Sequence, residues 1–172
     1  MFIRTVSAAV VGCMLLVAPL AAQSAKRGPS TPEERKQALA DIQTWQADPL
    51  GPNAKDELGW VLKWLADVPD ITVHVCTILD KLPKGDKKDS NTIFGGEFMA
   101  QAAFVIQNPD RKDDLQAEYQ AGVEGALRTY DHLLKSNPKD RQEYLDNLVK
   151  RRDAGALAQF VQERLAAGAC KN

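Results

Sequence analysis

The sequence predicts a single compact all-α domain of about six helices that follows a cleaved signal peptide. Three observations support this prediction. Apolar residues recur at helical spacing in most segments beyond residue 30. Prolines divide the chain at intervals of helix length. The β-branched run 71–75 has no second strand-like run with which to pair. We therefore divide the chain into a signal peptide over 1–22, a flexible spacer over 23–30 and a helical domain over 31–172.

The first segment has the organisation of a secretory signal peptide. One cation, Arg4, precedes an almost uninterrupted apolar run that ends in Ala21-Ala22. The run is slightly short for a membrane span, which needs about 20 residues, and Pro19 interrupts it. We predict cleavage after Ala22, a periplasmic or secreted location and no membrane insertion after cleavage. An uncleaved anchor or a lipid on Cys13 are the alternatives.

Composition limits the classes of partner. The chain has 172 residues and a net charge of −1, which becomes −2 once Arg4 is removed with the leader. This balance leaves no basic surface for nucleic acid, so we expect no nucleic-acid partner. About 150 remaining residues suffice to bury one core without a metal.

Two of the three cysteines remain after cleavage, because Cys13 leaves with the leader. In an oxidising compartment, Cys76 and Cys170 are expected to form one disulfide. The bond would tie the tail to the middle of the domain and contribute about 2 to 4 kcal/mol. Two separate thiols are the alternative.

The first two helices are delimited by capping residues and prolines. Thr31 followed by Pro32 has the pattern of an N-cap and first turn, and predicts a helix over 31–47. Asn53 can cap a second helix, which ends before Pro69 because a residue preceding proline avoids the helical region.

Two patterns conflict in the third segment, residues 71–82. Its β-branched start favours a strand. Its apolar residues also form a helical stripe, and no partner strand exists, so we predict a helix on which Cys76 points away from the stripe. The stripe consists of Ile71, Val75, Ile78, Leu79 and Leu82.

Four more helices are expected, at about 92–107, 111–136, from Asn137-Pro138 onward, and from Asp153 to Gly168. In the first of these, apolar residues predict one broad inward face, with Glu97 and Gln101 on the other. The inward face comprises Phe94, Phe98, Met99, Ala102, Val105 and Ile106.

Residues 126–138 resemble the second helix of a tetratricopeptide repeat, because Ala126, Tyr130 and Pro138 stand at the spacing of that family. The preceding helix does not match the repeat and the later helices do not continue it. We therefore interpret this segment as an ordinary amphipathic helix.

No linear motif for catalysis, a cofactor or a metal is found in the sequence. His74 beside Cys76 lacks the further ligands that a zinc site requires, and we interpret it as a partly buried histidine next to a disulfide cysteine. The acidic cluster 110–114 lacks the glycine and glutamate of a calcium loop. Paired carboxylates without a linear signature stay open, so an enzyme is one alternative.

Trp60 and Trp64 are the candidate binding residues of this sequence, because exposed tryptophans anchor protein interfaces. We favour the other interpretation, in which both rings pack in the core between two neighbouring helices. We predict an exported, non-catalytic protein that acts by protein–protein interaction as an inhibitor, immunity protein or adaptor, without a cofactor. The second hypothesis is a carrier of a small apolar ligand in a cavity lined by Phe94, Phe98 and Met99. Neither the partner nor the oligomeric state follows from the sequence.

Overall fold

Six α-helices and no strand are found in the described part of the chain, which confirms the predicted all-α fold. The computed structural model describes residues 27–76, 78–83, 85 and 87–170. The predicted signal peptide 1–22 lies outside these residues, as does the spacer up to residue 26. The helices are α1 (Pro32–Ala47), α2 (Ala54–Asp67), α3 (Ser90–Gln107), α4 (Leu115–Ser136), α5 (Glu143–Asp153) and α6 (Leu157–Ala166).

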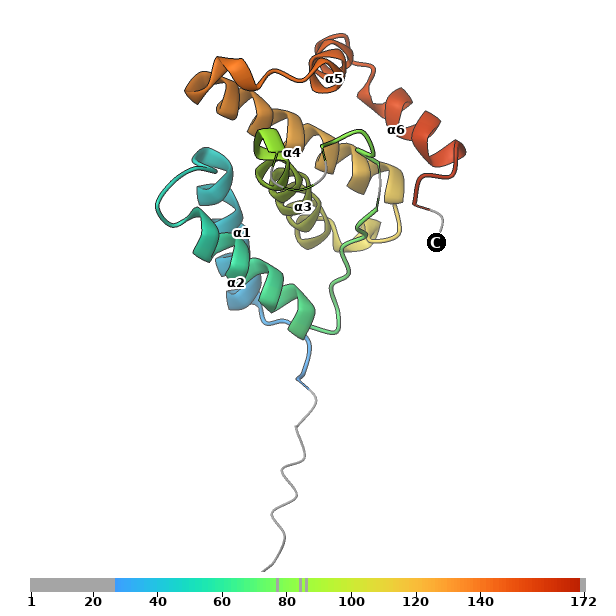
Figure 1. The fold of residues 1–172 in the computed structure, drawn as a ribbon. Coiled ribbons are helices and arrows are strands. Elements are labelled where there is room, and N and C mark those ends of the chain that lie inside the picture. The colour runs from blue at the N-terminus through green and yellow to red at the C-terminus, as the bar shows by residue number, and fades with distance from the viewer. Residues whose placement is uncertain (1–26, 77, 84, 86, 171–172) are drawn as a thin grey trace, which may run out of the picture.

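The pair α3 and α4 forms the centre of the molecule (Figure 1). Helices α1 and α2 pack on one side of this pair, and α5 and α6 lie on the other. Glycines allow α3 and α4 to approach closely, since a Cβ on Gly125 would overlap the Gly96 carbonyl and the Ala100 side chain. The absence of a side chain at Gly96 and Gly125 thus allows the two helix backbones to come into contact.

Two hydrophobic clusters lie on either side of the α3–α4 contact. One joins α1 and α2 to α3 around Trp45, Val61 and Met99. The other joins α4 to α5 and α6 around Tyr130 and Leu145. We call the first the α1–α2 cluster and the second the α4–α6 cluster. Apolar side chains of α3 belong to both clusters, which lie on opposite sides of this helix.

The capping residues predicted the starts of some helices correctly and of others only approximately. Thr31 and Glu34 form a reciprocal capping box at α1, as the sequence predicts. Asn53 occupies the N-cap position of α2 and the helix ends before Pro69, as predicted, but the Asn53 side chain makes no capping hydrogen bond. The long helix begins at Leu115, later than predicted, because a 3₁₀ turn precedes it and the Asp114 side chain accepts from the Ala117 N–H.

The start predicted for the last helix is also wrong. Asp153 closes α5, and α6 begins four residues later, at Leu157. Gly155 turns the chain between them at a φ of 71°, in the left-handed region that glycine adopts without strain.

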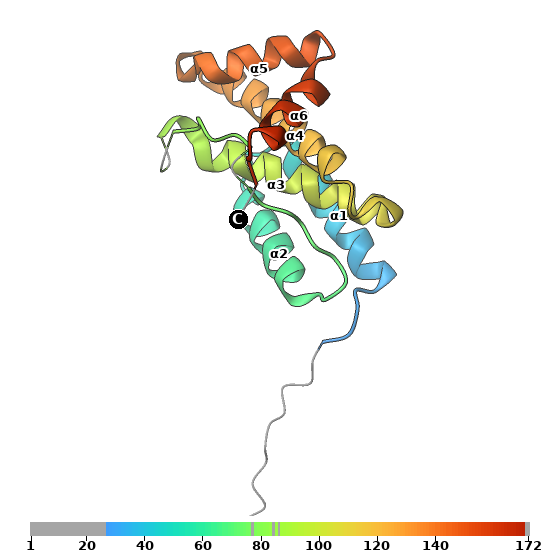
Figure 2. The same cartoon turned by 90° about the vertical axis from the view of Figure 1, so that its right-hand side faces the viewer.

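The predicted helix over 71–82 is wrong, since the described residues of this segment form neither a helix nor a strand. Ile71 and Val73 pack on the α1–α2 cluster, whereas Ile78 and Leu79 belong to the α4–α6 cluster. An extended residue advances the chain about twice as far as a helical one, so an irregular segment reaches both clusters. Figure 2 shows this connection running from the end of α2 past α3.

Among the described residues, no helix has both the length and the apolar character needed to cross a bilayer.

Candidate functional site

The two tryptophans of α2 stack on each other. Their rings are nearly parallel, with 5.9 Å between centroids. Trp64 is only 4% exposed and belongs to the core, whereas Trp60 is 38% exposed. The pair is therefore divided between the two roles that the sequence left open.

Packing rather than hydrogen bonding fixes the Trp64 ring, because its indole N–H has no acceptor among the described residues. Val61 and Trp64 are the buried side chains on this part of α2, and Leu62 is exposed. The buried face of α2 is thus the one that carries Val61 and Trp64, and Leu62 lies outside it.

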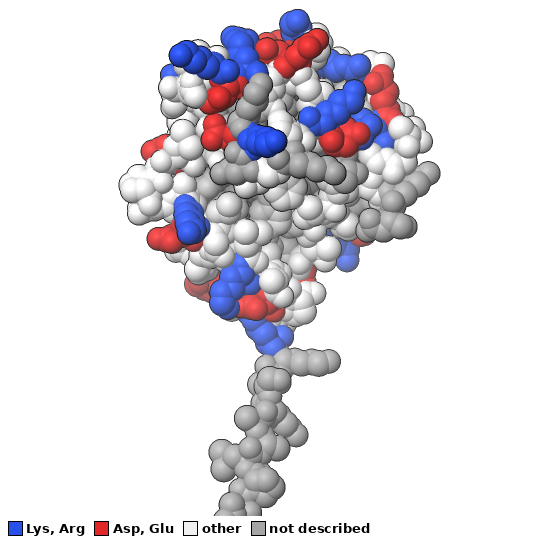
Figure 3. All heavy atoms as spheres, in the orientation of Figure 1, with Lys and Arg blue, Asp and Glu red and all other residues white. Residues whose placement is uncertain are grey.

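Charged residues surround Trp60 on the surface of α2. Asp56, Glu57 and Lys63 stand three or four residues away and therefore on the same side of the helix. Lys63 pairs with Asp67 at 2.9 Å. In Figure 3, positive and negative side chains lie next to each other near the top and bottom of the visible face, without a large area of one sign.

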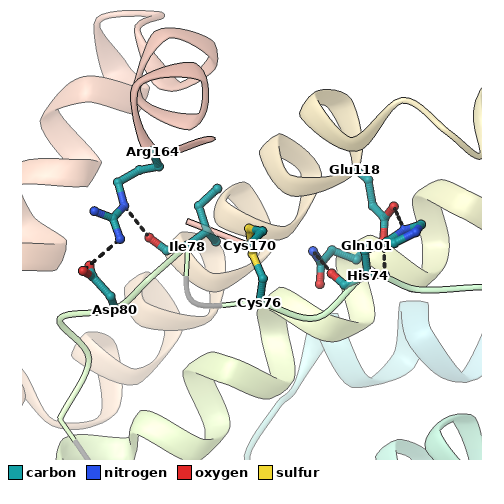
Figure 4. The surroundings of a disulfide bond; sticks show 8 residues. All are labelled: His74, Cys76, Ile78, Asp80, Gln101, Glu118, Arg164 and Cys170. Carbon is teal, nitrogen blue, oxygen red and sulfur yellow. Dashed lines mark hydrogen bonds and ion pairs between the residues drawn. A yellow bond between two sulfur atoms is a disulfide. The ribbon is translucent and has the colours of Figure 1, made fainter. Parts of the chain in front are cut away.

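The predicted disulfide between Cys76 and Cys170 is present and links the connecting segment to the C-terminal tail (Figure 4). Beside it, Arg164 of α6 pairs with Asp80 at 2.8 Å and donates to the Ile78 carbonyl. These contacts fasten the segment to α6.

A buried polar cluster holds the other end of this segment. The Glu118 carboxylate accepts from the His74 backbone N–H at 2.7 Å and contacts the His74 ring at Nδ1 at 2.8 Å. Gln101 donates to the His74 carbonyl at 3.2 Å. Burial raises the pKa of Glu118, and the hydrogen bonds and charge of His74 oppose that rise. The cluster satisfies the backbone of a segment that has no secondary structure.

A cavity of about 400 Å³ lies next to His74. Arg35 and Asp70 occupy one side of it and pair with each other at 2.8 Å. Ser30 donates to the same Asp70 carboxylate, so residues at the described end of the predicted spacer contact the domain.

Glu97 of α3 is the acidic residue whose predicted position differs most from the one in the structure. It was expected on an outward face but is only 3% exposed. No hydrogen bond or ion pair connects its carboxyl group to another described residue. Burial alone raises the pKa of Glu97 from its ordinary value of 4.5 to about 8.

Glu97 lines a cavity of about 270 Å³ between α3 and the connecting segment. Leu79 and Leu82 contribute apolar walls, together with Phe94, which is 42% exposed. The expectation that Phe94 faces inward is therefore wrong. Phe98 and Met99 are buried in the α1–α2 cluster, so the three residues proposed for a carrier cavity are not together.

Tyr144 of α5 supplies a second buried polar group in this region. Its hydroxyl has no partner among the described residues. Burial raises the pKa of Tyr144 to about 12, with smaller contributions from the negative charges of Asp80 and Glu97. The Tyr144 hydroxyl and the Glu97 carboxyl group thus lie within electrostatic reach of each other.

The described residues contain no group of three or more potential metal ligands.

The sequence of α4 contains one pattern that indicates where Glu97 and Glu118 are buried. Glu118, Gly122 and Gly125 stand at helical spacing on one face, which marks where another helix comes close. A Cβ on Gly122 would meet the side chains of Gln101 and Glu97 at 2.7 and 3.1 Å. The glycines therefore make room for the polar side chains of α3.

In comparisons with known proteins, no family model matches this chain, and neither a curated protein nor a solved structure matches it.

Proposed function

We propose that this chain is an exported, non-catalytic protein that binds another protein through the surface of α2 centred on Trp60. The observation that carries the proposal is the stacked pair, in which an exposed ring rests on a buried one. A side chain held in this way loses little conformational freedom on binding, which lowers the entropic cost of an interface.

The surroundings of Trp60 support the same proposal. Interfaces commonly have an aromatic centre and a polar rim, and the charged residues of α2 stand around the Trp60 ring. Helix α2 packs chiefly on α1 and lies at the edge of the molecule (Figure 1). A partner can therefore approach it without displacing another helix.

The proposed export is supported by the disulfide, because such bonds persist in oxidising compartments. The apolar leader in the sequence supports it independently.

Affinity capture from an extract of the exported fraction of the native host tests this function. The purified protein, Trp60→Ala and Leu115→Ala serve as three baits. Leu115 is an exposed apolar residue on α4, with an exposed fraction of 37% against 38% for Trp60, and provides the matched control. We expect one protein to be retained in stoichiometric amount by the wild type and Leu115→Ala but not by Trp60→Ala. Equal retention by all three baits, or no retention by the wild type, would contradict the proposal.

A second candidate function is carriage of a small ligand, which the cavity at Glu97 favours. Native mass spectrometry of protein isolated from its host tests this candidate, because a carrier retains a small additional mass that denaturation removes.

A further inference from the structure

The cavity at Glu97 combines an apolar wall with one carboxyl side chain that is almost completely buried and has no hydrogen-bond or ion-pair partner among the described residues. Folded proteins pair nearly all buried polar side chains, and an unpaired carboxyl group in such a place has a substantial free-energy cost. The cost is removed if a ligand supplies the missing hydrogen-bond donor. Glu97 is therefore the residue around which a ligand would be recognised.

The charges around Glu97 favour a cationic ligand group. Asp80 also lines the cavity and is negative, and its charge is shared with Arg164. Burial is what shifts the pKa of Glu97, and no cation among the described residues contributes to that shift. Among the described residues, the titratable or charged groups of the elements packed around it include His74, Asp80, Lys81 and Lys87 in the connecting segment, Glu118 and Tyr119 in α4, Tyr144 in α5 and Arg164 in α6.

The walls and the size of the cavity favour an organic cation over a metal ion. A metal ion needs several ligands, and no group of three exists among the described residues. Leu79, Leu82 and Phe94 instead offer apolar surface. A volume of about 270 Å³ lies below the usual range for drug-sized ligands, which limits the ligand to a small molecule.

We propose that this cavity binds a small organic ammonium compound, with the ammonium group on the Glu97 carboxylate and the apolar body against Leu79, Leu82 and Phe94. The inference specifies the second candidate function and is independent of the Trp60 surface. Phe94 stands at the exposed end of the cavity, where its ring can contact both the ligand and solvent.

Binding must be coupled to the release of a proton. At pH 7 the Glu97 carboxyl group is mainly protonated, because its pKa is about 8. An ammonium ion pairs with the carboxylate, so the carboxyl proton leaves to solvent when the ion pair forms. The dissociation constant should fall about tenfold per pH unit between pH 6 and 8 and level off above pH 8.

Titration calorimetry with hexylamine as the probe tests this inference, with hexanol as the uncharged control of the same chain length. Measurements in two buffers of different ionisation enthalpy give the number of protons released. We expect hexylamine to bind at least tenfold more tightly than hexanol at pH 8 and to release close to one proton at pH 7. Absence of hexylamine binding, equal affinity for the two probes or binding without proton release would overturn the inference.

Glu97→Gln is the informative variant, because it keeps the shape of the side chain and removes the charge. We expect it to lose the preference for hexylamine over hexanol, while Asn91→Ala, which changes an uncharged residue that lines the same cavity, keeps it. An unchanged preference in Glu97→Gln would overturn the inference. If that variant does not fold, ¹³C NMR can measure the pKa of the Glu97 carboxyl group in the wild type with and without hexylamine. We expect hexylamine to lower this pKa, and an unchanged pKa would contradict the proposed site. Trp60→Ala should bind hexylamine normally, which separates this result from the fate of the proposed protein interface.

Discussion

Glu97 is the residue whose ionisation the fold opposes most clearly. Its pKa is about 8 in the folded protein and near 4.5 when the chain is unfolded. The folded state therefore holds more protons between these two values, and the free energy of unfolding must fall as pH rises through that window. Below pH 4.5 and above pH 8, the folded and unfolded states hold the same number of protons at Glu97, so this residue adds no pH dependence to the free energy of unfolding.

Glu97→Gln tests the ionisation directly, because glutamine does not titrate. Relative to the wild type, we expect the variant to gain about 1.4 kcal/mol of stability per pH unit between pH 5 and 8. Urea unfolding at several pH values measures this difference. A difference that stays constant across the window would show that Glu97 ionises normally in the folded protein.

Trp64 and Trp60 should respond differently to truncation, although they touch. Trp64→Ala removes a buried ring and leaves a cavity, so we expect a loss of about 3 to 5 kcal/mol. Trp60→Ala removes a partly exposed ring and one stacking contact, so we expect a loss near 1 kcal/mol. Chemical denaturation of the two single variants measures both values, and equal losses would contradict the division between core and surface.

The sequence predicted the pair Trp60 and Trp64 but not the roles of the two rings. Helical spacing places both on one side of α2, but only tertiary packing decides which ring the neighbouring helices cover. Glu97 was misplaced for a similar reason. Amphipathic patterning assumes one solvent-facing side, whereas α3 has buried residues on nearly all its sides.

At the scale of elements, the connecting segment between α2 and α3 departs furthest from the sequence prediction. Its apolar residues have helical spacing, but they pack on two separate clusters. Glu118 and Gln101 satisfy the backbone at His74, and the disulfide fixes the chain two residues later. These long-range partners are not visible in any local pattern. The capped helices α1 and α4, by contrast, depend on neighbouring residues and were predicted to within a few positions.

The disulfide should contribute measurably to stability because it joins two cysteines with a sequence separation of 94 and so closes a long loop. We expect Cys170→Ser to lose about 2 kcal/mol, which corresponds to a fall of about 4 to 8 °C in melting temperature. Calorimetry of the variant, with the reduced wild type as control, checks this expectation. A variant that melts with the oxidised wild type would show that the bond does not constrain the chain.

At the scale of the whole molecule, the proposed export fixes the conditions under which the protein works. If the leader is cleaved after Ala22, the chain isolated from its native host begins at Gln23. Intact-mass spectrometry should show this end together with a mass two hydrogens below that of the reduced form. A chain that retains Met1 in the cytosolic fraction would contradict export.

The central claim is that this protein acts by binding a protein partner through Trp60 and not by catalysis. The most direct test measures the affinity of the captured partner for the wild type and for Trp60→Ala by surface plasmon resonance, together with the melting temperature of each. We predict that the variant binds at least about 30-fold more weakly, equivalent to 2 kcal/mol, while its melting temperature falls by no more than about 4 °C. Unchanged affinity in a folded variant would contradict the claim.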